Sequence, residues 1–230
     1  MSRILYGLCG SDKTRQFSPH VWKTIMSLKH KGLEFELRPV PFTEIPKIEG
    51  GCAKTVPLLN DEGTIVGDSF DIAVYLDEAY PDRPGLFGGD GGKAMARFIE
   101  GYSQTFIHAG ITKSILMDIH DILDPKDQAH FRTTREARFN MSIEDVYAGH
   151  AAEIAAFPQT LAPLRHTLSF QPWIGGQHPL FCDYIVFGAL QWARICSPAK
   201  LLPDGDPVAD WFERCLDLYD GAGRAVPAAA

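Results

Sequence analysis

The sequence predicts two parts: a small α/β unit of order βαβ and then ββα, followed by a bundle composed only of helices. Three observations predict this division. Over about the first 80 residues, short apolar runs alternate with amphipathic helical patterns, whereas the chain after residue 92 has only helical patterns. The segment between is dense in glycine and proline, which is typical of a linker. We therefore expect domains at residues 1–80 and 93–230, joined by a linker at 81–92.

The first unit begins with a strand, a helix and a second strand. Residues 4–8 form a short apolar run, and Ser18-Pro19 then supplies a serine N-cap and a proline at the first helical position. Gly32 provides the left-handed residue that ends such a helix. Residues 34–40 have the pattern of a second strand, parallel to the first because a right-handed crossover joins them.

A hairpin and a further helix complete the first unit. Residues 57–59 and 64–66 are strand-like and flank Asn-Asp-Glu-Gly, which places glycine at the tight position of a turn. Asp68 is then a candidate N-cap for a helix whose apolar residues recur on one face.

In the second part, residues 184–196 are apolar on nearly all sides. A helix with no face suited to water must lie at the centre of the bundle. We expect the surrounding helical segments to be 93–121, 127–156, 160–169 and 208–219.

Composition excludes several classes of protein. Hydrophobic residues at 45% and charged residues at 22% are typical of a folded globular chain. A net charge of -7 disfavours a nucleic-acid partner, since that affinity depends on basic residues. No apolar run approaches the roughly 20 residues that span a bilayer, and no signal-peptide core is present, so we expect a cytoplasmic protein with no membrane partner.

The cysteines and histidines predict no metal site. The five cysteines are odd in number and widely spaced, with neither Cys-x-x-Cys nor a zinc-ligand spacing, so free thiols are expected. His120 lies between Asp118 and Asp121, but a single histidine among surface acids is weak support for a metal.

Ser18 is the first residue with potential chemistry. Taken alone it is an N-cap that stabilises its helix by about 1 kcal/mol. A helix N-terminus that follows the first strand of a βαβ unit also concentrates unpaired N–H donors and positive potential, which stabilise a sulfur anion. The position therefore suits both a cap and a thiolate site.

Several motifs occur in a fixed order along the first unit. They are Phe-Ser-Pro-His-Val-Trp-Lys-Thr at 17–24, Leu-Lys-His-Lys-Gly at 28–32, Thr-Val-Pro-Leu at 55–58 and Asp-Ser-Phe-Asp-Ile-Ala-Val-Tyr-Leu-Asp at 68–77. In this order they resemble the glutathione transferase superfamily. The resemblance implies a thioredoxin-like N-terminal domain, an all-helical C-terminal domain, glutathione as co-substrate and a homodimer.

A closer resemblance involves later motifs as well. Tyr-Leu-Asp-Glu-x-Tyr-Pro-Asp-Arg-Pro-x-Leu-Phe at 75–87 and Leu-Tyr-Asp-Gly-x-Gly-Arg at 218–224 look like the bacterial lignin β-etherases and the fungal FuA-type transferases. This resemblance implies that glutathione displaces a phenolate from a β-aryl ether. The motifs are sparser in the helical half, where the electrophile is selected.

The resemblance also implies roles for individual residues. Ser18 would donate its hydroxyl hydrogen to the glutathione sulfur. A cis Val56–Pro57 peptide would expose the Val56 backbone to the cysteinyl part of glutathione. Ser69 would receive the γ-glutamyl carboxylate, and Asp68 would face the ammonium. Lys54 is a weaker candidate for the glycyl carboxylate.

The hydrophobic electrophile is expected against the first long helix of the second part. Its aromatic, methionine and histidine residues are the candidates, although such residues at helical spacing more often belong to a core. The candidates are Tyr102, Phe106, Met117 and His120.

Two alternatives and one departure from the family pattern remain. The chain could be a non-catalytic, glutathione-dependent binder of aromatic ligands, or a thiol transferase using Cys9 at the end of the first strand. No cysteine occupies the Ser18 position, which disfavours glutaredoxin-like chemistry. Asp183 resembles a structural capping aspartate, but Leu180 stands where Ser, Thr or Asn is usual, so the central helix is expected to begin differently.

Overall fold

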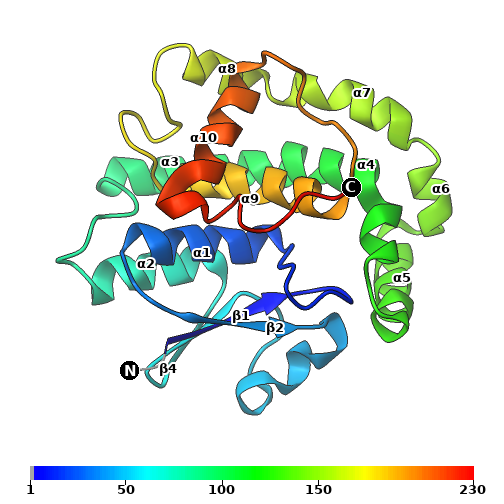
Figure 1. The fold of residues 1–230 in the computed structure, drawn as a ribbon, viewed down its shortest axis with the longest axis horizontal. Coiled ribbons are helices and arrows are strands. Elements are labelled where there is room, and N and C mark those ends of the chain that lie inside the picture. The colour runs from blue at the N-terminus through cyan, green and yellow to red at the C-terminus, as the bar shows by residue number, and fades with distance from the viewer. Residues whose placement is uncertain (1–2) are drawn as a thin grey trace.

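The computed structural model describes residues 3–230, so the first two residues of the predicted domain 1–80 lie outside the description. A four-stranded sheet of order β2-β1-β3-β4 forms the base of the molecule (Figure 1). β1 and β2 are parallel, and the other two pairings are antiparallel, which confirms the predicted βαβ-ββα order. The strands are β1 (Arg3–Leu8), β2 (Glu36–Val40), β3 (Leu58–Asp61) and β4 (Thr64–Gly67).

Helices α1 (Pro19–His30) and α2 (Ser69–Ala79) lie between the sheet and the helical part (Figure 1). Both begin at the predicted caps. The Ser18 hydroxyl oxygen accepts the Val21 N–H at 3.4 Å, and the Asp68 carboxylate accepts the Phe70 N–H at 2.7 Å. Gly32 has a φ of 63°, so it adopts the predicted left-handed conformation after α1.

One ordered segment of the first unit has no counterpart in the sequence prediction. η1 (Phe42–Gly51) is 3₁₀-helical and is interrupted by left-handed residues at Glu49 and Gly50. The Glu49 carboxylate accepts hydrogen bonds from the Tyr6 hydroxyl at 2.6 Å and from the Asn60 amide at 2.8 Å. Glu49 therefore ties the segment to β1 and β3, contacts that no local periodicity reveals.

The helical part is divided more finely than predicted. The predicted helix 93–121 is one long rod made of α3 (Asp90–Tyr102), a π-helical turn η2 (Ser103–Ile107) and α4 (His108–Asp121). The predicted segment 127–156 is broken, because Asn140 is left-handed and Ser142 caps a new helix by accepting the Asp145 N–H. This region forms α5 (Pro125–Phe139), α6 (Ile143–Tyr147) and α7 (His150–Thr160), and α8 (Ala162–Leu168) follows.

α3 begins inside the segment that the sequence indicates as linker. Gly92, which the sequence indicates as a helix breaker, lies in the first turn of α3. A Cβ atom at this position would lie 1.7 Å from the Phe87 carbonyl oxygen. Glycine here permits close packing of the incoming chain against the helix. The domain limits 1–80 and 93–230 stay a prediction.

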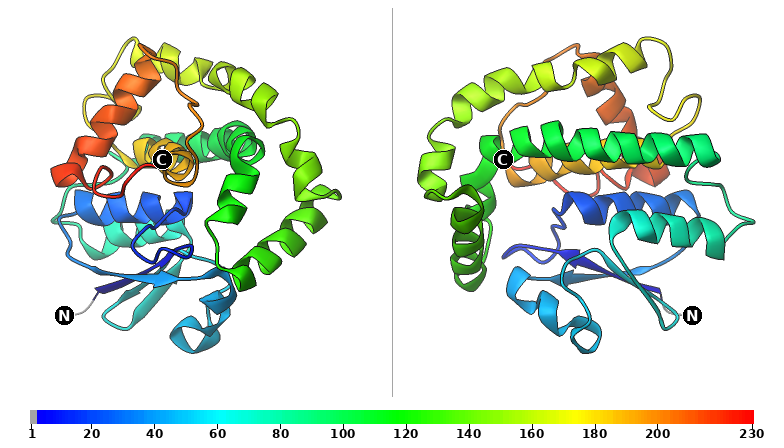
Figure 2. Two further views of the ribbon diagram at one scale, coloured as in Figure 1. Left: turned by 45° about the vertical axis from the view of Figure 1, so that its right-hand side comes forward. Right: turned by 180° about the vertical axis from the view of Figure 1, so that it is seen from behind.

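Helix α9 (Phe181–Cys196) is the centre of the helical part, as predicted, and nearly all of its residues are buried. α4 and α9 run through the middle, and α5 to α8 pass round the outside (Figure 2). α10 (Pro207–Gly221) closes the remaining side. No helix within residues 3–230 is long and apolar enough to cross a membrane.

The start of α9 depends on Asp183, in agreement with its predicted structural role. The buried carboxylate accepts the Leu180 N–H at 3.0 Å, the Ile174 N–H at 2.8 Å, the Gly175 N–H at 2.8 Å and the Trp211 indole N–H at 2.9 Å. Burial raises the pKa of Asp183, and these donors oppose that rise. Because Asp183 reaches back to the Leu180 N–H, the helix begins at Phe181 without a side-chain acceptor at the cap.

α9 packs closely against α1, and Gly188 makes this approach possible. A Cβ atom at Gly188 would lie 2.3 Å from the Pro19 carbonyl oxygen, nearer than real Cβ contacts allow. The first turn of α1, which carries Ser18, is therefore held directly against the central helix.

We expect Gly188→Ala to destabilise the protein by about 1–3 kcal/mol, because the added methyl group must push α1 away from α9. Urea denaturation measures the change. The control is Gly101→Ala in α3, where an added Cβ meets nothing within 4 Å, and which we expect to be stabilising by about 0.5–1 kcal/mol. Equal effects of the two substitutions would contradict the close-approach explanation.

Candidate functional site

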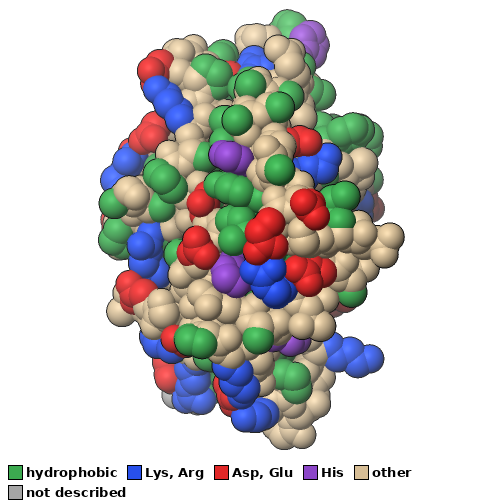
Figure 3. All heavy atoms as spheres, turned by 90° about the vertical axis from the view of Figure 1, so that its right-hand side faces the viewer, with side chains coloured by type: hydrophobic (Ala, Val, Ile, Leu, Met, Phe, Trp, Pro, Cys, Tyr) green, Lys and Arg blue, Asp and Glu red, His purple; other side chains and the backbone are tan. Residues whose placement is uncertain are grey.

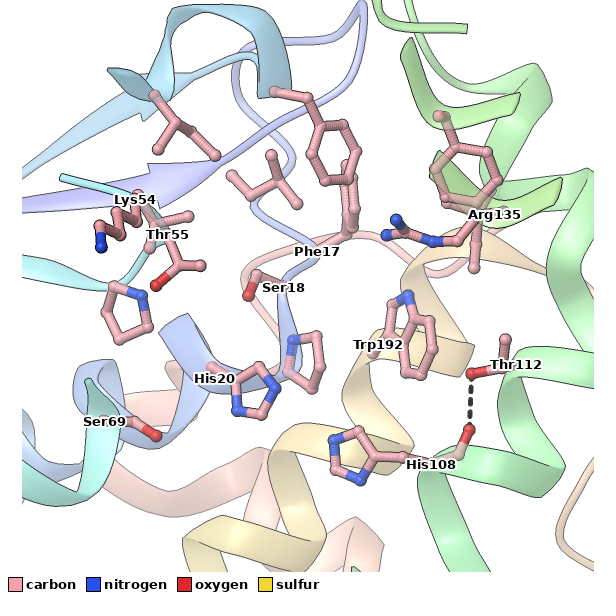
Figure 4. Close-up of a pocket in the computed structure, with 18 of the residues that line it drawn as sticks. Phe17, Ser18, His20, Lys54, Thr55, Ser69, His108, Thr112, Arg135 and Trp192 are labelled. Carbon is pink, nitrogen blue, oxygen red and sulfur yellow. Dashed lines mark hydrogen bonds between the residues drawn. The ribbon is translucent and has the colours of Figure 1, made fainter. Parts of the chain in front are cut away.

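A cavity of about 590 Å³ lies between the first unit and the helical part, beside the first turn of α1 (Figure 4). All six residues for which the sequence suggested a role with glutathione surround this one cavity. They come from the start of α1, from the loop before β3 and from the start of α2. They are Ser18, Lys54, Val56, Pro57, Asp68 and Ser69.

Ser18 is buried but faces the cavity. Its oxygen accepts the Val21 N–H, and within residues 3–230 its own O–H has no acceptor. The hydroxyl hydrogen is therefore available to an acceptor in the cavity, at a helix N-terminus where negative charge is favoured.

The start of α2 presents a second donor. The Ser69 hydroxyl is buried and has no hydrogen-bond partner in the described chain. A buried hydroxyl without a partner is unfavourable by about 1–3 kcal/mol, so an acceptor at this point would be bound firmly. Asp68, left-handed with a φ of 65°, uses its carboxylate to cap the helix and remains exposed.

The loop before β3 contributes backbone groups. The Val56–Pro57 peptide is cis, as predicted. In the described chain, neither the N–H nor the carbonyl of Val56 has a hydrogen-bond partner, although the residue is buried. Lys54 is exposed at the rim, where no ion pair is found for it in residues 3–230.

A stack of rings that the sequence did not reveal forms one wall. His20 and His108 are stacked with centroids 5.5 Å apart, and Trp192 from α9 lies 5.9 Å from His108. Burial, and then the Lys23 charge, lower the pKa of His20 well below its usual value and that of His108 to about 4. Both rings are therefore neutral near pH 7.

The tautomer of His108 follows from its contacts. Its Nδ1 lies 3.1 Å from the Ser103 carbonyl oxygen, which only accepts, so Nδ1 carries the hydrogen. Nε2 is buried without a partner in the described chain. His108 thus offers an unoccupied hydrogen-bond acceptor at the cavity wall.

The four residues predicted for the electrophile pocket do not line this cavity. The Tyr102 hydroxyl instead donates to the Thr160 carbonyl, Phe106 is 54% exposed, Met117 packs on the core and His120 contacts Asp121. The same rod lines the cavity through a different set: Gln104, His108, Ala109, Thr112, Leu116 and Ile119.

The prediction rested on residue type, which does not determine the face of the rod on which a side chain lies. Each residue of an α-helix turns by about 100°, so an error of one position moves a side chain to another face. A π-helical turn changes that phase within the rod. Met117 and His120 therefore lie one position beyond Leu116 and Ile119, which line the cavity.

Cys9 is fully buried and does not line the cavity. Burial raises the pKa of its thiol to about 11. Only the thiolate is nucleophilic, so this environment opposes thiol chemistry. Within residues 3–230, no group of three His, Cys, Asp or Glu side chains is placed to hold a metal.

Comparison with known families assigns the chain. Residues 17–79 match the glutathione S-transferase N-terminal domain, and residues 94–219 match the glutathione S-transferase C-terminal domain. The chain belongs to the glutathione S-transferase family.

Several members of the glutathione S-transferase family show the range of similarity. The glutathione S-transferase-like protein ustS of Aspergillus flavus is 23% identical over 83% of this chain and 78% of its own length. Arabidopsis thaliana glutathione S-transferase Z1 is 38% identical over 33% of this chain and 38% of its own.

Solved structures of glutathione transferases share the fold. GSTFuA3 of Phanerochaete chrysosporium superposes with a TM-score of 0.75 at 24% identity, over 98% of this chain and 94% of that one. CsGST63524 of Ceriporiopsis subvermispora, determined in complex with glutathione, has a TM-score of 0.76 at 23% identity over the full length of both chains.

We expect His108 to make stability depend on pH. Its pKa is about 4 in the folded protein, whereas an unfolded histidine titrates near 6.5. Below about pH 6.5 the unfolded state binds a proton that the folded state excludes, so stability falls as the pH drops toward 4. In His108→Asn, the loss of stability between about pH 7 and about pH 5 should shrink by about 2 kcal/mol.

Urea denaturation at the two pH values measures the free energy of unfolding. For each protein, the value at the higher pH is the reference against which the loss at the lower pH is compared. Parallel pH profiles for the parent and His108→Asn would show that the ring does not titrate as the structure predicts.

Proposed function

We propose that this chain is an enzyme that transfers glutathione to a hydrophobic electrophile, with Ser18 stabilising the glutathione thiolate. The observation that carries the proposal is the Ser18 hydroxyl, held at the N-terminus of α1 and facing a cavity that also receives the unpartnered Ser69 hydroxyl. Family membership and glutathione-bound structures of similar fold support glutathione as the co-substrate.

The remaining residues then take complementary roles. Glutathione lies along the first unit, with its γ-glutamyl carboxylate at Ser69 and its ammonium toward Asp68. The cysteinyl backbone pairs with the peptide groups of Val56, which have no partner of their own in residues 3–230. Lys54 at the rim is placed for the glycyl carboxylate. The sulfur then reaches Ser18.

Substitution of the two serines separates binding from activation. Calorimetry should show that Ser69→Ala strongly weakens the binding of glutathione, whereas Ser18→Ala weakens that binding only a little. Because a hydrogen bond to a charged acceptor contributes about 1.5–3 kcal/mol, Ser18→Ala should raise the pKa of the bound thiol by roughly one to two units.

The ultraviolet absorbance of the thiolate, recorded against pH, measures that pKa. An unchanged thiol pKa in Ser18→Ala would remove the proposed role of Ser18, and no glutathione binding in the parent would remove the transferase proposal itself.

For the electrophile we propose a lignin-type β-aryl ether with an α-ketone. The thiolate attacks the β-carbon and forms a C–S bond while the β-carbon–oxygen bond breaks. The electron pair leaves with the phenolate, which then takes a proton from water. Support comes from the motif resemblance at 75–87 and 218–224.

Incubation with glutathione and an α-keto β-aryl ether tests this substrate, and we expect equal amounts of phenol and glutathione conjugate. If neither forms while other electrophiles react, the ether proposal fails and the transferase proposal stands.

Ligand binding without turnover of any electrophile would favour a non-catalytic binder. The buried, high-pKa Cys9 argues against the thiol-transfer alternative, in which Cys9→Ser would abolish deglutathionylation.

We also propose that the protein is cytoplasmic and that it is a homodimer, the latter because its family resemblance implies one. Two large apolar side chains of α3 support a partner surface, since Phe98 is 71% exposed and Met95 is 50% exposed. Apolar groups exposed together in this way commonly mark an interface. Sedimentation equilibrium decides the point, because the mass of a single chain at micromolar concentration would reject the dimer.

A further inference from the structure

Arg135 is a cationic group inside the cavity for which the fold provides no anion. It lies on α5, and its guanidinium points into the cavity between Phe17 and Trp192 (Figure 4). Its one hydrogen bond goes to the Thr134 hydroxyl oxygen at 3.0 Å, and no carboxylate pairs with it in the described chain. By contrast, Arg132 on the same helix pairs with Glu136 and Glu144.

Aromatic rings enclose the guanidinium. Its central carbon lies 4.6 Å from the Phe131 ring centroid and 5.8 Å from that of Phe42. Burial, and then the neighbouring Arg138 charge, lower the pKa of Arg135. An arginine nevertheless stays charged. A partly desolvated cation without a counterion is unfavourable, so an anion placed there by a ligand would be strongly favoured.

Both acids of α5 are already occupied. Glu136 pairs with Arg132 at 3.0 Å. The buried Asp127 carboxylate accepts the Phe42 N–H at 2.6 Å and the Thr43 N–H at 3.0 Å. It therefore holds the Phe42 ring in the cavity wall and has no free role as a counterion. Asp68, the only carboxylate among the described lining residues, belongs to the first unit and caps α2.

The charge of the cavity is thus opposite to that of the chain. The sequence has a net charge of -7, yet the described lining carries Lys54, Arg135 and Arg138 against Asp68 alone. On the outer face shown in Figure 3, acidic and basic side chains are interspersed.

We infer that Arg135 binds a carboxylate on the electrophile, so that the preferred substrates are aromatic carboxylic acids with an electrophilic carbon. The inference rests on the proposed function, which assigns both carboxylates of glutathione to the first unit and leaves the α5 wall to the second substrate. A carboxylate matches the planar fork of arginine, and Phe42, Phe131 and Trp192 accommodate the attached ring.

A matched pair of substrates tests the inference. Para-chloro-meta-nitrobenzoate and the corresponding benzamide differ at the carboxyl group alone, and in both the thiolate displaces chloride from the ring. We expect Arg135→Met to lower the ratio of kcat/KM for benzoate over benzamide by about 10- to 100-fold. Arg135→Lys should keep part of the preference. Arg132→Met, which removes a charge from the same helix outside the cavity, should keep all of it.

The outcomes separate this inference from the proposed function. If Arg135→Met lowers kcat/KM equally for the benzoate and the benzamide, the inference is overturned. If Arg135→Met raises the KM for glutathione when the benzamide is the second substrate, the inference is also overturned, because Arg135 would then contact glutathione. If neither substrate turns over, calorimetry of benzoate binding still tests whether Arg135 binds the carboxylate. Binding weakened in Arg135→Met and unchanged in Arg132→Met supports the inference, whereas equal binding in all variants rejects it.

Discussion

The close packing of α9 against the first turn of α1 is the contact on which the rest of the structure depends. Gly188 lets the backbone of α9 come against the Pro19 carbonyl, and Pro19 follows the serine that faces the cavity. The same helix carries Trp192 one turn later, so one rigid element fixes both the N-terminus of α1 and a wall of the cavity. The buried Asp183 anchors the start of that element with four N–H donors.

A network at the other end of α1 holds the same two helices together. The His30 Nδ1 lies 2.6 Å from the Tyr184 hydroxyl of α9 and 3.1 Å from the Tyr219 hydroxyl. The buried Lys31 pairs with Asp77 of α2 at 2.6 Å, and Asp77 also accepts the Leu86 N–H. These residues belong to motifs that are far apart in the sequence. Part of the motif pattern thus records how the two parts of the chain are joined.

What the sequence predicts well is chemistry that is complete within a few residues. The local roles of Ser18, Gly32 and Asp68 can be predicted from the sequence because a helix cap or a left-handed residue depends only on the residues of its own turn. The central position of α9 can be predicted because a helix without a polar face must be buried within the bundle. In contrast, His108, Arg135 and Trp192 meet only after three helices pack. α5 is strongly polar and gives no apolar stripe to orient it, and the π-helical turn shifts the face of α4. The residues of the first unit that line the cavity were therefore predictable, and those of the helical part were not.

This division has a consequence for catalysis. Lowering a thiol pKa from about 8.5 to about 6.5 raises the thiolate fraction at pH 7 from roughly 3% to roughly 75%. Intrinsic nucleophilicity falls with pKa at a Brønsted slope near 0.4–0.5, which removes about 6- to 10-fold of that gain. In the proposed mechanism Ser18 then contributes only a few-fold net, and most of the acceleration must come from alignment of sulfur and electrophile. Alignment is a property of the helical wall, to which His108, Trp192 and Arg135 belong. Because these residues come from the part of the chain that local patterns do not specify, rate and substrate choice can change there while the glutathione side stays the same.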